Sequence, residues 1–203
     1  LNSASWLYFW TFNEGRGADL GSLWYLLQLV GYPVADPSRM ETILMVVGTL
    51  VICALLLFAP RRPRLAQGVF LIVAWFLVVN KVYSPQYVLW LLPLLALARP
   101  RWLDWAVFSI SETCYFAAIW LYLNDLTIDN AGSYPYYWFA IMLRIAVQLW
   151  LCAKVVYDIF HPEADVVRAH GRDDPDGGAL DWAADANWVR GIAPVAPQPT
   201  TYR

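Results

Sequence analysis

The chain has 203 residues, of which 60% are hydrophobic and only 15% are charged. An average soluble domain is about 45–50% apolar and about 25% charged, so the composition argues against a soluble domain and favours a membrane protein. The net charge of −2 gives no support for a nucleic-acid partner.

Residues 1–40 predict an outer loop followed by a short helix. Within them, residues 13–31 begin polar and glycine-rich and then become apolar. Ser22 is suited to cap the start of this helix and Gly31 to end it. About ten residues are too few to cross a bilayer, so we expect the helix to lie along the outer membrane surface. Because the chain starts at Leu1 with no signal-like basic segment, we expect it to be the C-terminal part of a longer protein.

Apolar runs fill residues 41–160 and predict an all-α, GT-C-like bundle with about five transmembrane spans. A bilayer core about 30 Å thick needs about 20 residues of helix, and the third run is shorter than this. Pro85 and Pro93 favour broken helices there. We expect two crossings with the joint (residues 80–86, NKVYSPQ) sunk into the outer interface, while a re-entrant hairpin is the alternative. The runs are 42–58, 65–79, 87–98, 102–123 and 137–157.

Basic residues between the runs predict the orientation, because cytoplasmic loops are enriched in Lys and Arg. The N-terminal segment and the joint then lie outside the cytoplasmic membrane. Residues 161–203 are rich in Asp, Gly and Pro, which predicts a disordered cytoplasmic tail. The basic residues used are Arg61, Arg62, Arg64, Arg99, Arg101 and Lys154.

The joint carries a dense set of polar groups at the mouth of the membrane. Lys81, Tyr83, Ser84 and Gln86 offer an ammonium, hydroxyls and an amide, which suit a phosphate or pyrophosphate headgroup. The apolar helices below would accept its lipid tail. The alternative is that Lys81 and the tyrosines only anchor the helix ends.

A second polar group precedes the short helix. Asn13, Glu14 and Asp19 could bind a sugar or an acceptor, and a carboxylate there could act as a general base on an acceptor hydroxyl. The alternative is a solvated turn in which Arg16 pairs with Glu14 or Asp19.

A third group consists of two charged residues, Glu112 and Arg144, each of which lies within an apolar run. Glu112 is about halfway along the fourth run, and Arg144 lies in the fifth. Because an isolated charge at such depth is costly, we expect them to pair and to hold the two spans together, or Arg144 to reach towards the outer site.

No pattern predicts a metal ion or a cofactor. Asp125 and Asp129 lie four apart in a loop and are expected to be solvated. Cys53, Cys114 and Cys152 lie inside apolar runs without ligand spacing, so we expect buried thiols.

The chain resembles the C-terminal part of actinobacterial enzymes of glycosyltransferase family 87, polyprenol-phosphate-mannose-dependent mannosyltransferases of the GT-C class. The resemblance rests on NEGRGADLGSLWYLL at 13–27 and NKVYSPQYVLWLLPLLAL at 80–97, and covers roughly residues 5–160. It implies an integral membrane enzyme that passes a sugar from a polyprenyl-phosphate carrier to a lipid or glycan acceptor on the outer face.

The resemblance also implies roles for the joint. Lys81 would hold the carrier phosphate, with Tyr83, Ser84 and Gln86 around it and Arg16 as a second candidate. GT-C enzymes carry their acidic catalytic residue in a first outer loop that this chain lacks, so no catalytic residue is assigned.

Other functions remain open from the residues alone. A non-catalytic transporter or a scaffold for envelope assembly would use the intramembrane Glu112 and Arg144, since transporter sites lie near the bilayer midplane. A ligase-like enzyme that moves whole glycans is a third possibility.

Overall fold

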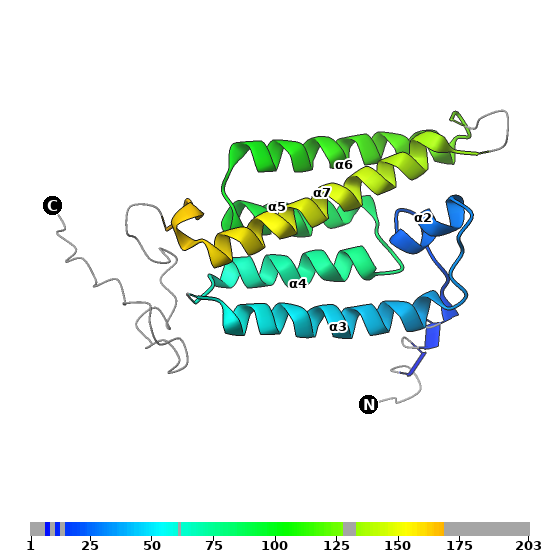
Figure 1. Cartoon of the computed structure of the whole chain (residues 1–203). Helices are drawn as coiled ribbons and strands as arrows, with labels where there is room; N and C mark the ends of the chain where they lie inside the picture. The colour runs from blue at the N-terminus through cyan, green and yellow to red at the C-terminus, as the bar shows by residue number, and fades with distance from the viewer. Residues whose placement is uncertain (1–6, 9–10, 13–14, 61, 128–132, 169–203) are drawn as a thin grey trace, which may run out of the picture.

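A computed structural model of the chain describes residues 7–8, 11–12, 15–60, 62–127 and 133–168. These residues form helices and no strands, which confirms the all-α prediction. Figure 1 shows the long helices running back and forth beside one another, with the short helix α2 at one end. The elements are α2 (Leu23–Leu29), α3 (Pro37–Phe58), α4 (Leu65–Val79), η1 (Pro85–Tyr87), α5 (Val88–Ala98), α6 (Trp102–Leu123), α7 (Pro135–Phe160) and η2 (Pro162–Ala164).

Three of the described helices, α3, α6 and α7, are long and apolar enough to cross a membrane. The apolar helices α4 and α5 are shorter. The structure therefore agrees with a multi-pass membrane protein, while five full crossings and a GT-C arrangement stay predictions.

Local sequence explains how the short outer elements begin and end. The Ser22 side chain accepts from the Tyr25 backbone N–H at 3.1 Å and caps α2, and Gly31 follows that helix with a φ of +86°. Both predictions for this helix are confirmed. At the start of α3, Asp36 accepts from the Arg39 backbone N–H at 3.0 Å, and Pro37 takes the first helical position.

The helices α4 and α5 form an antiparallel pair that stops short of the end reached by α3, α6 and α7 (Figure 1). The helix α2 lies at this end, where the pair stops. Pro85 begins the short helix η1 between α4 and α5, in agreement with the helix break predicted at this proline. Pro93 lies inside α5 and does not end it, so the expected break at that proline is wrong.

The core has two parts that meet along α7. One part lies among α4, α5 and α7, where Phe70, Leu77, Leu91 and Leu151 are buried. The other lies between α6 and α7 and continues under α2. The helix α7 therefore contacts most of the bundle, and it carries buried polar side chains into the centre.

The helix α3 has no buried residue and packs mainly against α4. The contact is built around Trp75, whose indole N–H donates to the Leu44 carbonyl at 2.9 Å. The indole lies over Gly48, where an added Cβ would be 1.9 Å from the Trp75 ring nitrogen. Gly48 thus provides the space in which α4 approaches α3.

Gly48→Ala is expected to move α3 away from α4 and to break the Trp75 hydrogen bond. Overpacking of this kind costs about 1–3 kcal/mol, which a thermal unfolding scan in an uncharged detergent would detect. Gly68→Ala is the matched control on α4, because its Cβ would meet only the Leu56 side chain, at 3.2 Å. Equal unfolding temperatures for the two variants would contradict this account.

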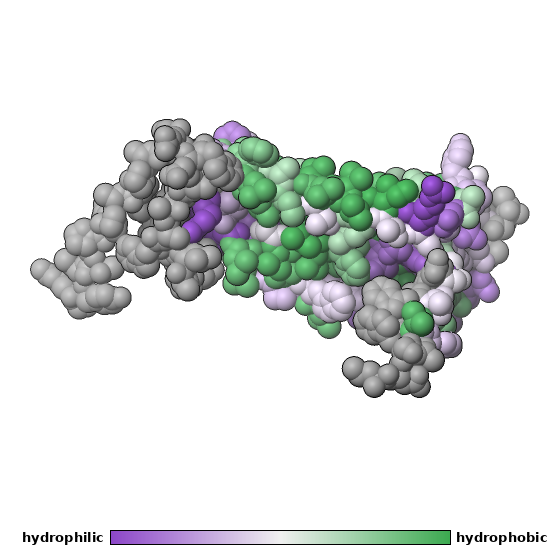
Figure 2. All heavy atoms as spheres, turned by 90° about the horizontal axis from the view of Figure 1, so that it is seen from below, coloured by the Kyte–Doolittle hydropathy of each residue, from purple (hydrophilic) through white to green (hydrophobic). Residues whose placement is uncertain are grey.

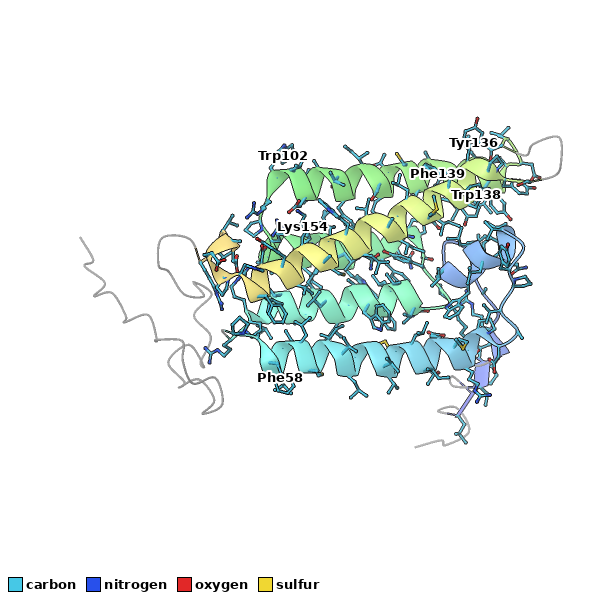
Figure 3. The ribbon with its side chains drawn as sticks, viewed as in Figure 1. Phe58, Trp102, Tyr136, Trp138, Phe139 and Lys154 are labelled. Atoms are coloured by element: carbon cyan, nitrogen blue, oxygen red, sulfur yellow. The ribbon has the colours of Figure 1, made fainter. Side chains whose placement is uncertain are left out.

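The outer surface of the helices is apolar along its middle and polar towards its ends. Figure 2 shows this pattern on the face seen from below. Aromatic side chains mark both ends, with Phe58 and Trp102 towards one and Tyr136 and Phe139 at the other (Figure 3). Apolar bands flanked by aromatic residues are typical of membrane proteins. Exposed residues of the band include Val47, Leu50, Val51, Leu89, Ile110 and Phe116.

The expected disorder of residues 161–203 is wrong for residues 161–168. These residues continue from α7 through η2 and pack against the bundle, and Asp165 is buried. Residues 169–203 lie outside the described part of the chain.

The cysteines are not the buried thiols that the apolar runs suggest. Cys53 and Cys114 are exposed and Cys152 is half-buried, and all three are free thiols. The expectation fails because α3 and α6 turn apolar faces outwards, which is typical of helices that contact lipid.

Candidate functional site

The two polar segments found in the sequence meet at one end of the bundle. The Asp19 backbone N–H donates to the Lys81 carbonyl at 2.9 Å, and the Trp24 indole N–H donates to the Val79 carbonyl at 2.7 Å. Residues 15–29 therefore cover part of the joint, in which Lys81 and Tyr83 are buried, Ser84 is half-buried and Gln86 is exposed.

Lys81 is held by protein groups. Its ammonium donates to the Arg16 carbonyl at 3.0 Å and to the Ser38 hydroxyl at 2.8 Å, and a Glu41 carboxylate oxygen lies 4.0 Å away. The residue is only 7% exposed. A phosphate would have to displace these contacts to reach the ammonium, so the role of Lys81 in carrier binding stays a prediction.

Tyr83 points into the bundle. Its hydroxyl donates to the Gln148 side-chain oxygen, and the Gln148 amide donates to the Ala74 carbonyl at 2.7 Å. The hydroxyl therefore serves as a donor to α7.

The predicted pair of Arg144 and Glu112 is confirmed. The Arg144 Nε lies 2.8 Å from a Glu112 carboxylate oxygen. The two terminal nitrogens donate to the Tyr83 carbonyl at 2.8 Å and to the Ser84 carbonyl at 3.2 Å. The guanidinium carbon lies 3.5 Å from the ring centre of Tyr83 and 4.2 Å from that of Tyr115.

These contacts explain how a fully buried guanidinium is tolerated. Its charge is balanced by Glu112 on α6, its N–H groups find acceptors, and aromatic rings lie against it. In return, Arg144 supplies donors to a stretch of backbone between two helices. Buried backbone outside a helix is stable where the protein satisfies its polar groups, and Arg144 does this from α7 for the Tyr83 and Ser84 carbonyls.

The segment before α2 forms a turn stabilised by an ion pair. Arg16 pairs with Asp19, and their side chains are 43% and 32% exposed. The alternative of a turn with an internal ion pair is thus confirmed for these two residues. Asn13 and Glu14 lie outside the described residues, so their predicted part in sugar or acceptor binding stays untested.

Tyrosine side chains fill the space between α2, α6 and α7. The hydroxyls of Tyr25 and Tyr122 lie 2.6 Å apart, and the Tyr122 ring stacks on Tyr137 with centres separated by 4.2 Å. Burial raises the pKa of the Tyr25 hydroxyl, and the hydrogen bond to Tyr122 is the second largest cause of this shift. This cluster attaches α2 to the two long helices, which keeps the cover over the joint in place.

Asp125 is more than a solvated residue. The Tyr134 hydroxyl donates to its carboxylate at 2.9 Å, and this bond raises the pKa of Tyr134. Asp129 lies outside the described residues. Within the described ranges, no group of three His, Cys, Asp or Glu side chains stands close enough together to hold a metal ion.

A second charged cluster lies at the opposite end of the bundle, where the sequence places cytoplasmic arginines. Arg99 pairs with Asp104 and Asp158, and Arg64 pairs with Asp165 at 2.8 Å. These arginines are buried. They therefore hold helix ends together instead of facing lipid headgroups.

Sequence reasoning missed two residues of the Arg144 network. Tyr115 lies one turn after Glu112 on α6, and Gln148 lies one turn after Arg144 on α7. Residues three or four apart share a face of a helix, so this spacing was the signal that could have found them.

Comparison with known protein families, curated proteins and solved structures found no match to the chain. The fold and contacts define its class as an all-helical protein whose apolar exterior suits a membrane.

Proposed function

We propose that the chain is part of a membrane glycosyltransferase. It would take a sugar from a polyprenyl-phosphate carrier and pass it to a lipid or glycan acceptor on the outer face of the cytoplasmic membrane. The family resemblance suggests that this sugar is mannose. The observation that carries the proposal is that the two segments of the resemblance form one unit. The hydrogen bonds of Asp19 to Lys81 and of Trp24 to Val79 join them.

Arg16 is the best candidate for the carrier phosphate. Among the described residues its side chain pairs with the Asp19 carboxylate, which is 32% exposed, and an ion pair near the surface contributes about 0–1 kcal/mol. A phosphate can compete for such a guanidinium because Arg binds phosphate through two parallel bonds. Lys81 would have to give up its contacts with Arg16 and Ser38 first.

The lipid part of a carrier has an apolar path beside the joint. Gln86 is exposed, and Leu89 and Trp90 follow it along the chain with exposed apolar side chains. An isoprenoid tail that contacts α5 here would keep its headgroup near the polar joint, which supports a carrier site at this end.

Arg16→Gln is expected to lower sugar transfer about 10- to 100-fold, because a bond to a charged group is worth about 1.5–3 kcal/mol. The assay would measure labelled mannose passed from polyprenyl-phosphate mannose to lipid or glycan in membranes that contain the full-length protein. Asp19→Asn breaks the same ion pair but keeps the charge of Arg16, so we expect it to retain transfer.

Three results would count against this account. Full activity of Arg16→Gln would remove Arg16 from the site, and equal losses in both variants would make the ion pair structural. No transfer by the unaltered full-length protein would contradict the glycosyltransferase proposal itself. Lys81→Ala is a weaker probe, because it also removes the contacts with Arg16 and Ser38.

A transporter is the less favoured alternative. Its main support was a pair of intramembrane charges, but Glu112 and Arg144 neutralise each other and Arg144 also binds the joint carbonyls. These contacts give the ion pair a structural role, so its presence inside the bundle does not require a transported ion.

A further inference from the structure

The chain turns back against the bundle after α7. We call residues 162–168 the strap. Its short helix η2 contains no buried residue. Polar contacts attach it to the loops beside α4 and α6, since Arg101 donates to the Ala164 carbonyl at 2.7 Å and Arg168 donates to the Arg62 carbonyl. The strap is therefore held mainly by hydrogen bonds and charge.

Asp165 is the buried acidic residue of the strap, with 1% of its surface exposed. One carboxylate oxygen accepts from the Arg64 Nε at 2.8 Å and from the Gln67 amide at 3.1 Å. The other accepts from an Arg64 terminal nitrogen at 3.2 Å. Arg64 thus binds this carboxylate through two nitrogens, the geometry with which arginine also binds phosphate.

The side chains that bind Asp165 are positioned by the bundle, although the Val167 backbone N–H of the strap also donates to its carboxylate, at 3.0 Å. Arg64 donates to the carbonyls of Leu97 and Ala98 at the end of α5, at 2.8 and 2.6 Å. The Gln67 side-chain oxygen accepts from the Arg64 backbone N–H at 3.0 Å, which turns its amide group towards the carboxylate. The donors would therefore remain in place if the strap moved away.

Nearby charges leave this site positive. Arg99 pairs with both Asp104 and Asp158, so that group carries one negative charge in excess, against the two positive charges that Arg64 and Arg101 have without Asp165. Without the strap, Arg64 would lose its carboxylate partner and Arg101 would lose its bond to the Ala164 carbonyl. A buried arginine without a counterion is costly, so the site requires an anion.

We propose that Arg64, Gln67 and Arg101 form an anion-binding site, that Asp165 is its internal ligand, and that a phosphate group occupies the site when the strap is released. The phosphate can be free or part of a lipid headgroup, since both present the same oxygens. The proposal does not depend on the glycosyltransferase function, because the site lies at the other end of the bundle from the joint.

The test follows thermal unfolding of the full chain with Asp165→Ala in an uncharged detergent, as inorganic phosphate is added. The unfolding temperature is expected to rise by about 3–5 °C at a phosphate concentration about tenfold above the dissociation constant. The unaltered protein is expected to show no such rise, because Asp165 fills the site. Adding Arg64→Gln to Asp165→Ala should abolish the effect.

Asp36→Ala is the matched control. It also removes one carboxylate that accepts hydrogen bonds, but Asp36 is an exposed cap of α3 with no arginine site. It should lower stability without creating a dependence on phosphate. A phosphate effect of equal size in this control would overturn the proposal.

Asp165→Asn serves if the alanine variant does not fold, because it keeps the shape and removes the charge. The absence of a phosphate-dependent rise in both variants would overturn the proposal. A failure of both variants to fold would also overturn it, since the strap would then be an integral part of the fold.

A second experiment, in bilayer discs, distinguishes a lipid phosphate from a free one. A rise in phosphatidylglycerol discs relative to phosphatidylcholine discs, lost with Arg64→Gln, supports a lipid ligand, whereas a rise with free phosphate alone supports a soluble one.

Discussion

Arg144→Met is expected to lower the free energy of unfolding by about 3–5 kcal/mol, the usual cost of breaking a buried ion pair from one side. The substitution leaves the Glu112 carboxylate buried without its counterion and removes the donor to the Tyr83 carbonyl. Thermal or denaturant unfolding of the protein in detergent would measure the loss.

The double variant Glu112→Leu, Arg144→Met is the control for the charge. It removes both members of the pair, so no uncompensated charge remains, although the Tyr83 carbonyl still loses its donor. We expect it to be more stable than Arg144→Met alone, and the double-mutant cycle gives the coupling between the two residues. Independent, additive losses from the two substitutions would show that the ion pair does not stabilise the fold.

Gly21→Ala is expected to be the second most damaging single change, with a loss of about 2–5 kcal/mol in unfolding free energy. Gly21 has a φ of +78°, a conformation that costs an L-residue about 1–2 kcal/mol. The new Cβ would also lie 2.0 Å from the Tyr115 hydroxyl oxygen and 2.6 Å from the Tyr83 carbonyl oxygen. Overpacking adds about 1–3 kcal/mol, and backbone atoms such as this carbonyl cannot easily move aside.

Gly31→Ala separates these two costs. Its φ is +86°, but nothing lies within 4 Å of the new Cβ. We therefore expect only the conformational cost at Gly31, and the difference between the two variants measures how closely the turn before α2 packs on the joint. If Gly21→Ala and Gly31→Ala unfold at the same temperature, the close packing is not important for stability.

The helices could be predicted well from sequence because long apolar runs are separated by clear turn signals. The expected runs 65–79 and 102–123 have the same limits as α4 and α6. The pairing of Glu112 with Arg144 could be predicted because a charged residue inside an apolar helix needs a partner of opposite charge. The apolar runs contain few charged residues that could serve as that partner.

The direction of the joint side chains could not be predicted. Lys81 and Tyr83 look like surface groups in the sequence because they lie between two apolar runs. Whether they face solvent depends on α2, which covers the joint through tertiary contacts of Trp24. No local pattern encodes this cover.

The strap was missed because its composition is polar. Asp165 is one of many charged residues after α7, and its partner Arg64 lies 101 residues earlier in the chain. Composition describes the average behaviour of a segment, whereas one buried ion pair can order several residues. Sequence spacing across such a distance does not reveal the contact.

The covered joint has a consequence for the order in which its contacts can form during synthesis. The carbonyls of Val79 and Lys81 accept from residues made before α4, but the Tyr83 carbonyl accepts from Arg144, which is made after it. A buried backbone carbonyl without a donor is costly. The α4–α5 pair therefore does not satisfy the backbone of its own joint, and the joint reaches its final set of contacts only after α7 has been made.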